Sequence, residues 1–96
     1  MSLRPGMRIW LPCEVKPGPF SDERMVRLGA SGEEWLGFVD VHSLRDAVTE
    51  GSTYVRALVV EVRDDDFVAR LPGYSVSSDL FRGSVSKVAE VGSLEA

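Results

Sequence analysis

Hydrophobic and polar residues alternate along most of the chain, which is the pattern of half-buried β-strands. The first such run covers residues 7–15 and places Ile9, Leu11 and Cys13 on one face. Pro12 lies within this run and has no backbone N–H to donate to a neighbouring strand. We therefore predict an edge position or a β-bulge at Pro12.

Five further strands are predicted from short runs rich in valine and aromatic residues, over residues 23–28, 34–41, 54–63, 67–71 and about 81–88. Glycine, proline and aspartate residues separate these runs, as expected for turns. The 54–63 run has the fewest polar positions and is predicted to be central in the sheet. The two ends, residues 1–5 and 90–96, are predicted to fray.

One segment between the third and fourth predicted strands has helical rather than alternating spacing. Ser43 is a suitable N-cap, Asp46 follows at capping-box spacing, and Gly51 is a suitable stop. These signals predict a helix of about two turns over residues 44–50.

Together the elements predict a mainly β fold: a small barrel, or half-open barrel, of five to six antiparallel strands with one short helix. Two packed sheets are the alternative arrangement. Residues 1–96 are predicted to form a single domain, as the length suggests.

Two features resemble known small-barrel modules. The segment EWLGFV at residues 34–39 resembles the strand of Src-homology-3-like barrels in which a tryptophan precedes a glycine–aromatic–valine step. The order of three strands, a helix and further strands is similar to that of the OB-fold, whose helix lies between its third and fourth strands. Both resemblances imply a binding module, and the sequence does not separate the two topologies.

Composition narrows the class of protein. With 44% hydrophobic and 27% charged residues the chain is too apolar for a disordered tail. No stretch approaches the roughly 18 apolar residues of a membrane-spanning helix, and no signal peptide is visible, so we predict a cytoplasmic protein without membrane contact. A single cysteine excludes an internal disulfide, which fits a reducing compartment.

The charge balance bears on the partner. Eleven Lys and Arg against fifteen Asp and Glu give a net charge of −4, which disfavours binding to a nucleic-acid backbone. Strand alternation nevertheless allows Arg24, Arg56 and Arg70 to be exposed together on one face. If they cluster there, the alternative function is an OB-type binder of single-stranded nucleic acid or nucleotides.

Candidate chemistry is sparse. The only possible thiol–imidazole pair is Cys13 with His42, and the pattern predicts a core position for the first and a loop position for the second. A small enzyme using either residue is a second alternative, and we predict that the chain is not an enzyme. No zinc-ligand spacing occurs, and Asp64–Asp66 is predicted to be a solvated turn, so no metal or cofactor is expected.

Two loops are the candidate recognition elements. Loop 16–22 is stiffened by two prolines and carries Phe20, which is either an apolar recognition tip or a lid folded onto the core; the lid is favoured because large aromatic side chains usually bury. In loop 72–80, Tyr74 is predicted to form an aromatic patch with Trp10 or Trp35, suited to an extended peptide.

The leading prediction is a non-enzymatic binding or assembly module that contacts a protein or peptide through loops 16–22 and 72–80 or through a strand edge. An exposed edge also permits self-association. The candidate binding residues are Trp10, Phe20, Arg24, Arg56, Arg70 and Tyr74.

Overall fold

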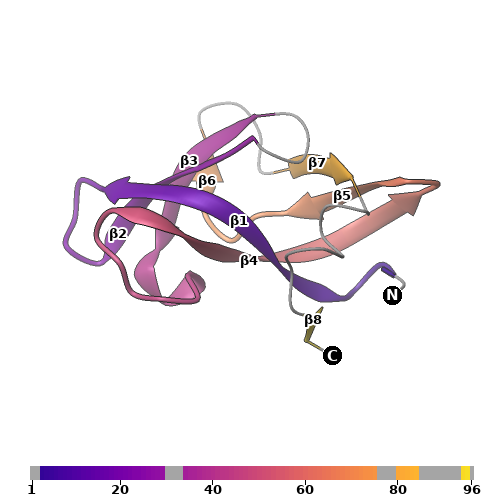
Figure 1. The fold of residues 1–96 in the computed structure, drawn as a ribbon, viewed down its shortest axis with the longest axis horizontal. Coiled ribbons are helices and arrows are strands. Elements are labelled where there is room, and N and C mark those ends of the chain that lie inside the picture. The colour runs from indigo at the N-terminus through magenta and orange to yellow at the C-terminus, as the bar shows by residue number, and fades with distance from the viewer. Residues whose placement is uncertain (1–2, 30–33, 76–79, 85–93, 96) are drawn as a thin grey trace.

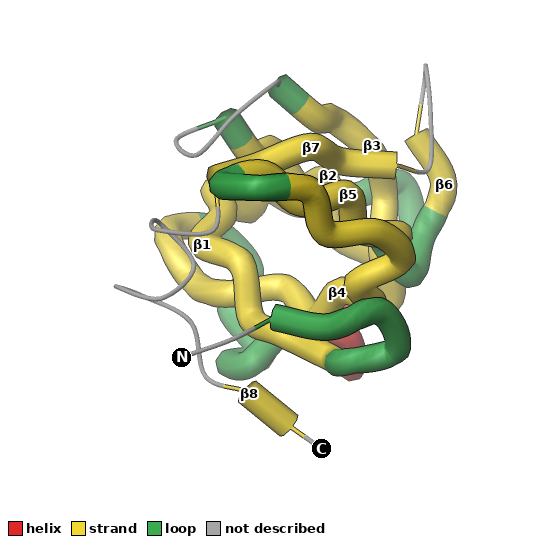
Figure 2. The backbone as a smooth tube through the Cα atoms, turned by 90° about the vertical axis from the view of Figure 1, so that its right-hand side faces the viewer, coloured by secondary structure: helices red, strands yellow, loops and turns green. Residues whose placement is uncertain are grey.

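A computed structural model describes residues 3–29, 34–75, 80–84 and 94–95. The mainly β prediction is confirmed: the strands form a nearly closed antiparallel barrel (Figure 2). The strands are β1 (Arg8–Pro17), β2 (Glu23–Leu28), β3 (Trp35–Asp40), β4 (Gly51–Arg63), β5 (Asp66–Arg70), β6 (Tyr74–Ser75), β7 (Leu80–Ser84) and β8 (Leu94–Glu95).

The strand order is β6-β3-β2-β1-β4-β5-β7, and β8 pairs with β1. Strands β1, β2 and β3 follow one another as a meander, and β4 then returns to lie beside β1, which is a Greek-key arrangement. In Figure 1 the turn between β1 and β2 and the turn between β4 and β5 lie at opposite ends of the longest axis. The barrel therefore has two well-separated ends.

The core follows from the predicted alternation. Ile9, Leu11 and Val15 point inward from β1 and are almost completely buried, while the intervening residues face outward. From β5 and β7, Phe67 and Phe81 meet with ring centroids 6.3 Å apart. Fully burying one such side chain contributes about 1.5–3 kcal/mol, so these residues stabilise the barrel strongly.

Strand β4 is central, as predicted, because it pairs with β1 on one side and β5 on the other. Its inner face carries Val55 and Val59, which are buried. Its outer face is also partly apolar, and there Leu58 and Val60 remain 38% and 37% exposed. The apolar character of β4 thus comes from one buried face and one exposed apolar face.

The predicted helix over 44–50 is wrong. The structure has a single 3₁₀ turn at Val41–Ser43 instead, and Leu44 is extended and bridges to Val55 of β4. The Arg45 backbone N–H donates to the Tyr54 carbonyl at 2.8 Å. A two-turn helix gains few internal hydrogen bonds for its nucleation cost, so pairing with β4 replaces it.

Among the described residues, Pro12 lies in a part of β1 that pairs with β4 alone, because the β1–β2 ladder begins at Glu14 and β8 pairs with Arg8 and Ile9. Here β1 is locally an edge strand, which agrees with the predicted edge position.

Both ends of the chain, predicted to fray, contain parts packed on the barrel. The Leu3 side chain is buried in the core, and Leu94–Glu95 pairs with Arg8 and Ile9 of β1. The last predicted strand begins one residue early as β7, and residues 85–88 lie outside the described residues.

Within the described part of the chain, no helix has the length and apolar character needed to span a membrane.

Candidate functional site

The outer face of β1 and β4 brings two of the predicted binding residues together. Trp10 lies directly opposite Arg56 in the β1–β4 register. The Arg56 guanidinium carbon lies 5.9 Å from the centre of the Trp10 ring, which is within the range of a cation–π contact. Trp10 is half-buried and Arg56 is exposed, so the pair is accessible at the surface.

A second aromatic contact lies two residues further along the same strands. Pro12 is opposite Tyr54, and the guanidinium carbon of Arg45 lies 5.4 Å from the centre of the Tyr54 ring. Pro12 and Tyr54 are also half-buried. Trp10, Pro12 and Tyr54 together form what we call the aromatic row.

The aromatic row continues into an open groove with a volume of about 640 Å³. Its lining comes from β1, β2 and β4 and from the segment before β3. It includes Pro12, Tyr54, Glu14, Arg27, Glu34 and Ser52, with the buried Cys13 and Thr53 between them. Arg27 Nε donates to Glu34 at 2.5 Å, and Ser52 Oγ donates to Glu14 at 2.9 Å. These contacts give the groove polar walls beside an apolar row.

Arg70 lies on the same outer surface as Arg56. It is exposed and pairs with Leu58, which follows Arg56 by two residues and therefore faces the same way. Strand registers thus place Trp10, Arg56 and Arg70 near one another.

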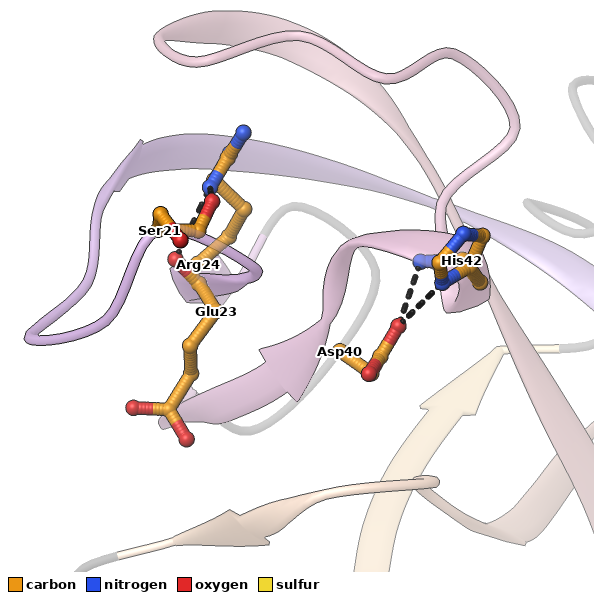
Figure 3. Close-up of polar contacts among 5 residues, drawn as sticks. All are labelled: Ser21, Glu23, Arg24, Asp40 and His42. Atoms are coloured by element: carbon orange, nitrogen blue, oxygen red, sulfur yellow. Dashed lines mark hydrogen bonds and ion pairs between the residues drawn. The ribbon is translucent and has the colours of Figure 1, made fainter.

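Arg24 is not part of this group. It pairs with Pro17 at the far end of β1, seven residues beyond Trp10, which is roughly 20 Å along a strand. Its guanidinium donates within the protein: Nη1 to the carbonyls of Ser21 at 2.8 Å and Glu23 at 3.0 Å, and Nε to the carbonyl of Val48 at 2.9 Å. Figure 3 shows Arg24 beside Ser21 and Glu23 at the β1–β2 turn. Through Val48, Arg24 also connects this turn to the chain before β4.

The 3₁₀ turn is fixed by a second contact in the same view. Asp40 accepts a hydrogen bond from the backbone N–H of His42, and its Oδ1 also lies 2.8 Å from His42 Nδ1 (Figure 3). These hydrogen bonds, that from the backbone N–H first, hold the pKa of Asp40 below its ordinary value. The contact shapes the turn and leaves the imidazole exposed.

Phe20 is the most exposed large hydrophobic residue of the described part, with 66% of its surface accessible. The favoured expectation, that it folds back as a lid on the core, is wrong. Gly18 explains the geometry: its N–H donates to the carbonyl of Glu23, and a Cβ there would lie 2.7 Å from that oxygen. The turn closes on itself and leaves its tip in solvent.

The predicted aromatic patch of Tyr74 with Trp10 or Trp35 lies partly outside the described residues. Trp35 is buried in the core, so it offers no surface. The backbone of Tyr74 pairs with Phe38 of β3 in the two-residue strand β6, and its side chain lies outside the described structure. Residues 76–79 of loop 72–80 also lie outside it.

Cys13 faces inward from β1 beneath the groove. Burial, with a smaller effect of the Glu14 charge, raises the pKa of its thiol to about 12. A thiol in this setting stays protonated at neutral pH and is a poor nucleophile. His42 is exposed in the 3₁₀ turn, so the two side chains stand in opposite environments.

The acidic triplet forms the predicted turn. Asp64 adopts a positive φ of 53°, which aspartate tolerates, and Arg63 pairs with Asp66 across the turn. Across the described ranges, His, Cys, Asp and Glu side chains do not gather in any group of three that could hold a metal ion.

Tyr54, Pro12 and Arg45 are the surface residues that sequence reasoning missed. The alternation of β1 shows that Pro12 shares a face with Trp10. The position of Tyr54 beside them depends on the register between β1 and β4, which the sequence does not show. Arg45 reaches Tyr54 because its segment is not helical and its backbone bonds to Tyr54.

No known protein family matches the chain, and no curated protein or solved structure matches it significantly.

Proposed function

We propose that the chain is a non-enzymatic binding module whose partner-contacting surface is the outer face of β1 and β4. The observation that carries this proposal is the aromatic row Trp10, Pro12 and Tyr54, half-exposed beside a groove and flanked by two arginines stacked on its rings.

The chemistry of this surface suits an extended peptide. Aromatic rings and proline offer flat apolar area at little cost in conformational entropy, and Trp, Tyr and Arg are the residues that most often dominate binding energies. Aromatic-lined grooves commonly take extended or proline-rich segments. An arginine over each ring adds a planar cationic group, which suits contact with a backbone carbonyl or a carboxylate.

Other surfaces are secondary in this proposal. Phe20 at the tip of loop 16–22 supplies a second apolar contact point, at the opposite end of the barrel from the β4–β5 turn. Loop 72–80 and the outer strand edges remain proposed contact points, including for self-association. A reducing compartment such as the cytoplasm is proposed because the single thiol is a core residue.

The test is selection from a displayed library of random peptides. We expect the folded protein to enrich peptides that lose about tenfold or more in affinity with Trp10→Ala, because an aromatic anchor is removed. The matched control is Phe20→Ala, which truncates an exposed aromatic residue away from the aromatic row. Failure to enrich any peptide, or equal loss with both variants, would contradict the proposal.

A second candidate function is OB-type binding of single-stranded nucleic acid. It is favoured by the placement of Arg56 and Arg70 near Trp10, and the Greek-key strand order is one that OB-folds share. It predicts binding of a short oligothymidylate that weakens steeply as salt rises. Absence of binding at low salt would end this alternative.

A further inference from the structure

Four of the nine arginines lie on one outer face of the barrel. The register places Arg8 opposite Leu58, Leu58 opposite Arg70, and Arg70 opposite Leu80, which forms one row across β1, β4, β5 and β7. Facing residues in such a row have Cβ atoms about 4.5–5.5 Å apart. Arginine and leucine therefore alternate across four strands.

Two more arginines flank this row. Arg56 is two residues before Leu58 on β4, and Arg82 is two residues after Leu80 on β7, so both face the same way as the row. All four arginines are exposed. We call this surface the arginine face and define it by Arg8, Arg56, Arg70, Arg82, Leu58 and Leu80.

The arginine face also has an apolar component. Leu58 and Leu80 are 38% and 41% exposed, and Val60, which a register shift in β4 leaves outside the β4–β5 pairing, is 37% exposed. Three of the five exposed large hydrophobics of the described part therefore lie on or beside one cationic surface. Such a combination is typical of a contact surface.

The charge of this surface is opposite to that of the whole chain. The four guanidinium groups stand on a protein of net charge −4. The register places Glu61 opposite Val68, and this carboxylate is ion-paired with Arg63 at 2.9 Å. Asp66 lies at the β4–β5 turn, at the border of the face. Glu95 of β8 is opposite Arg8 in the β1–β8 register, and Arg82 lines a small pocket together with Glu61 and Asp66. Arginines still outnumber the acidic residues at these positions.

From this arrangement we propose that the arginine face binds an extended acidic segment of a partner protein, in which carboxylates alternate with apolar side chains. The proposal rests on the proposed function, since it names the partner class of the same binding module. Carboxylates accept paired hydrogen bonds from arginine, and apolar side chains of the segment cover Leu58 and Leu80.

An acidic peptide fits this face better than a nucleic acid. Exposed leucines gain from contact with apolar side chains, whereas single strands are held mainly by stacking on aromatic rings. The ring beside this face is that of Trp10, over which the Arg56 guanidinium already lies.

The experiment uses the peptides selected against the full chain. We expect them to carry an excess of Asp and Glu with interspersed apolar residues. The most frequent peptide, fluorescently labelled, is expected to bind about tenfold or more weakly to Arg70→Glu, because a salt bridge becomes a repulsion. Lys16→Glu is the matched control, since Lys16 is exposed on β1 outside the face and the charge change is identical.

Four outcomes would overturn the inference. Selected peptides without an acidic bias would leave the binding module standing and refute the partner class. Equal affinity for the wild type and for a folded Arg70→Glu would place the contact elsewhere. Tighter binding of a short oligothymidylate than of the peptide, lost in Arg70→Glu, would assign the face to nucleic acid. A Gln-for-Glu version of the peptide that binds undiminished would also refute the charge contribution.

Discussion

Arg24 and Arg56 lie in separate parts of one sheet and use the same guanidinium group in opposite ways. Arg24 is half-buried, and its donors are occupied by three backbone carbonyls. Arg56 is exposed and its guanidinium lies over the Trp10 ring. The first region, residues 18–24, is held by internal hydrogen bonds, whereas the outer face of β1 and β4 presents its side chains at the surface.

The type of a residue and its place in a strand therefore do not by themselves determine its role. Both arginines lie in predicted strands and are each followed by an apolar residue, so they look similar along the chain. The difference arises from what faces them: a tight turn and the Val48 carbonyl for Arg24, and an aromatic ring on a paired strand for Arg56.

The largest expected loss of stability comes from adding a side chain at Gly18, in the tight turn between β1 and β2. In Gly18→Ala the new Cβ would lie 2.7 Å from the Glu23 carbonyl oxygen, which accepts from both Gly18 N–H and Arg24. Displacing this oxygen weakens both bonds, so we expect a loss of about 2–4 kcal/mol in the free energy of unfolding, measured by urea denaturation. Gly29→Ala is the control: its Cβ meets nothing closer than 4.0 Å, and a loss as large as that of Gly18→Ala would contradict this account.

The next largest effect is the difference in unfolding free energy between the Arg24→Ala and Arg56→Ala variants. Arg24→Ala removes three hydrogen bonds to backbone carbonyls and is expected to cost about 1–3 kcal/mol of unfolding free energy. Arg56→Ala removes an exposed contact and is expected to cost under about 1 kcal/mol. Thermal unfolding of the two variants measures the difference, and equal destabilisation would remove the distinction between the regions.

The buried thiol of Cys13, on the inner face of β1, makes the stability of the protein depend on pH in the alkaline range. Because the pKa of Cys13 is raised to about 12 in the folded protein from an ordinary value of 9.0, folding favours the protonated thiol. This contribution is complete below pH 9 and is lost as pH rises from 9 towards 12, with a slope of at most about 1.4 kcal/mol per pH unit. Cys13→Ala should therefore show a shallower alkaline loss of stability than the wild type; identical slopes would show that the thiol is not buried in this way.

The smallest effect concerns the turn beside Arg24. The pKa of Asp40 is lowered mainly by the backbone N–H of His42, so His42→Ala should keep most of the shift in an NMR titration. The lowered pKa makes a small stabilising contribution above the ordinary aspartate pKa, and it is lost as pH falls through the lowered value. Return of the Asp40 pKa to its ordinary value in His42→Ala would assign the shift to the imidazole instead.

The predicted strands and their order were sufficient to predict a mainly β barrel. Alternation in the first run placed Ile9 and Leu11 on one face, and the low polarity of residues 54–63 indicated the central place of β4. The 44–50 helix was wrong because capping signals are local, whereas the backbone of Leu44 and Arg45 bonds to β4. Phe20 was assigned to the core by its residue type, although the closed turn at Gly18 keeps it outside.

Of the candidate site, the sequence identified Trp10, Arg56 and Arg70 but could not group them. Their grouping depends on the registers of β1–β4 and β4–β5, which no local pattern specifies. The same registers bring in Arg8 and Leu80. A surface formed by residues from several strands can therefore be recognised only when the strand registers are known.

The most direct measurement is an NMR titration of the isotope-labelled protein with the selected acidic peptide. The account predicts that the Trp10 indole signal and the side-chain N–H signals of Arg56 and Arg70 shift, while the backbone signals of Gly18 and Arg24 stay in place. Shifts concentrated at Gly18–Arg24, with the arginine face unaffected, would contradict it.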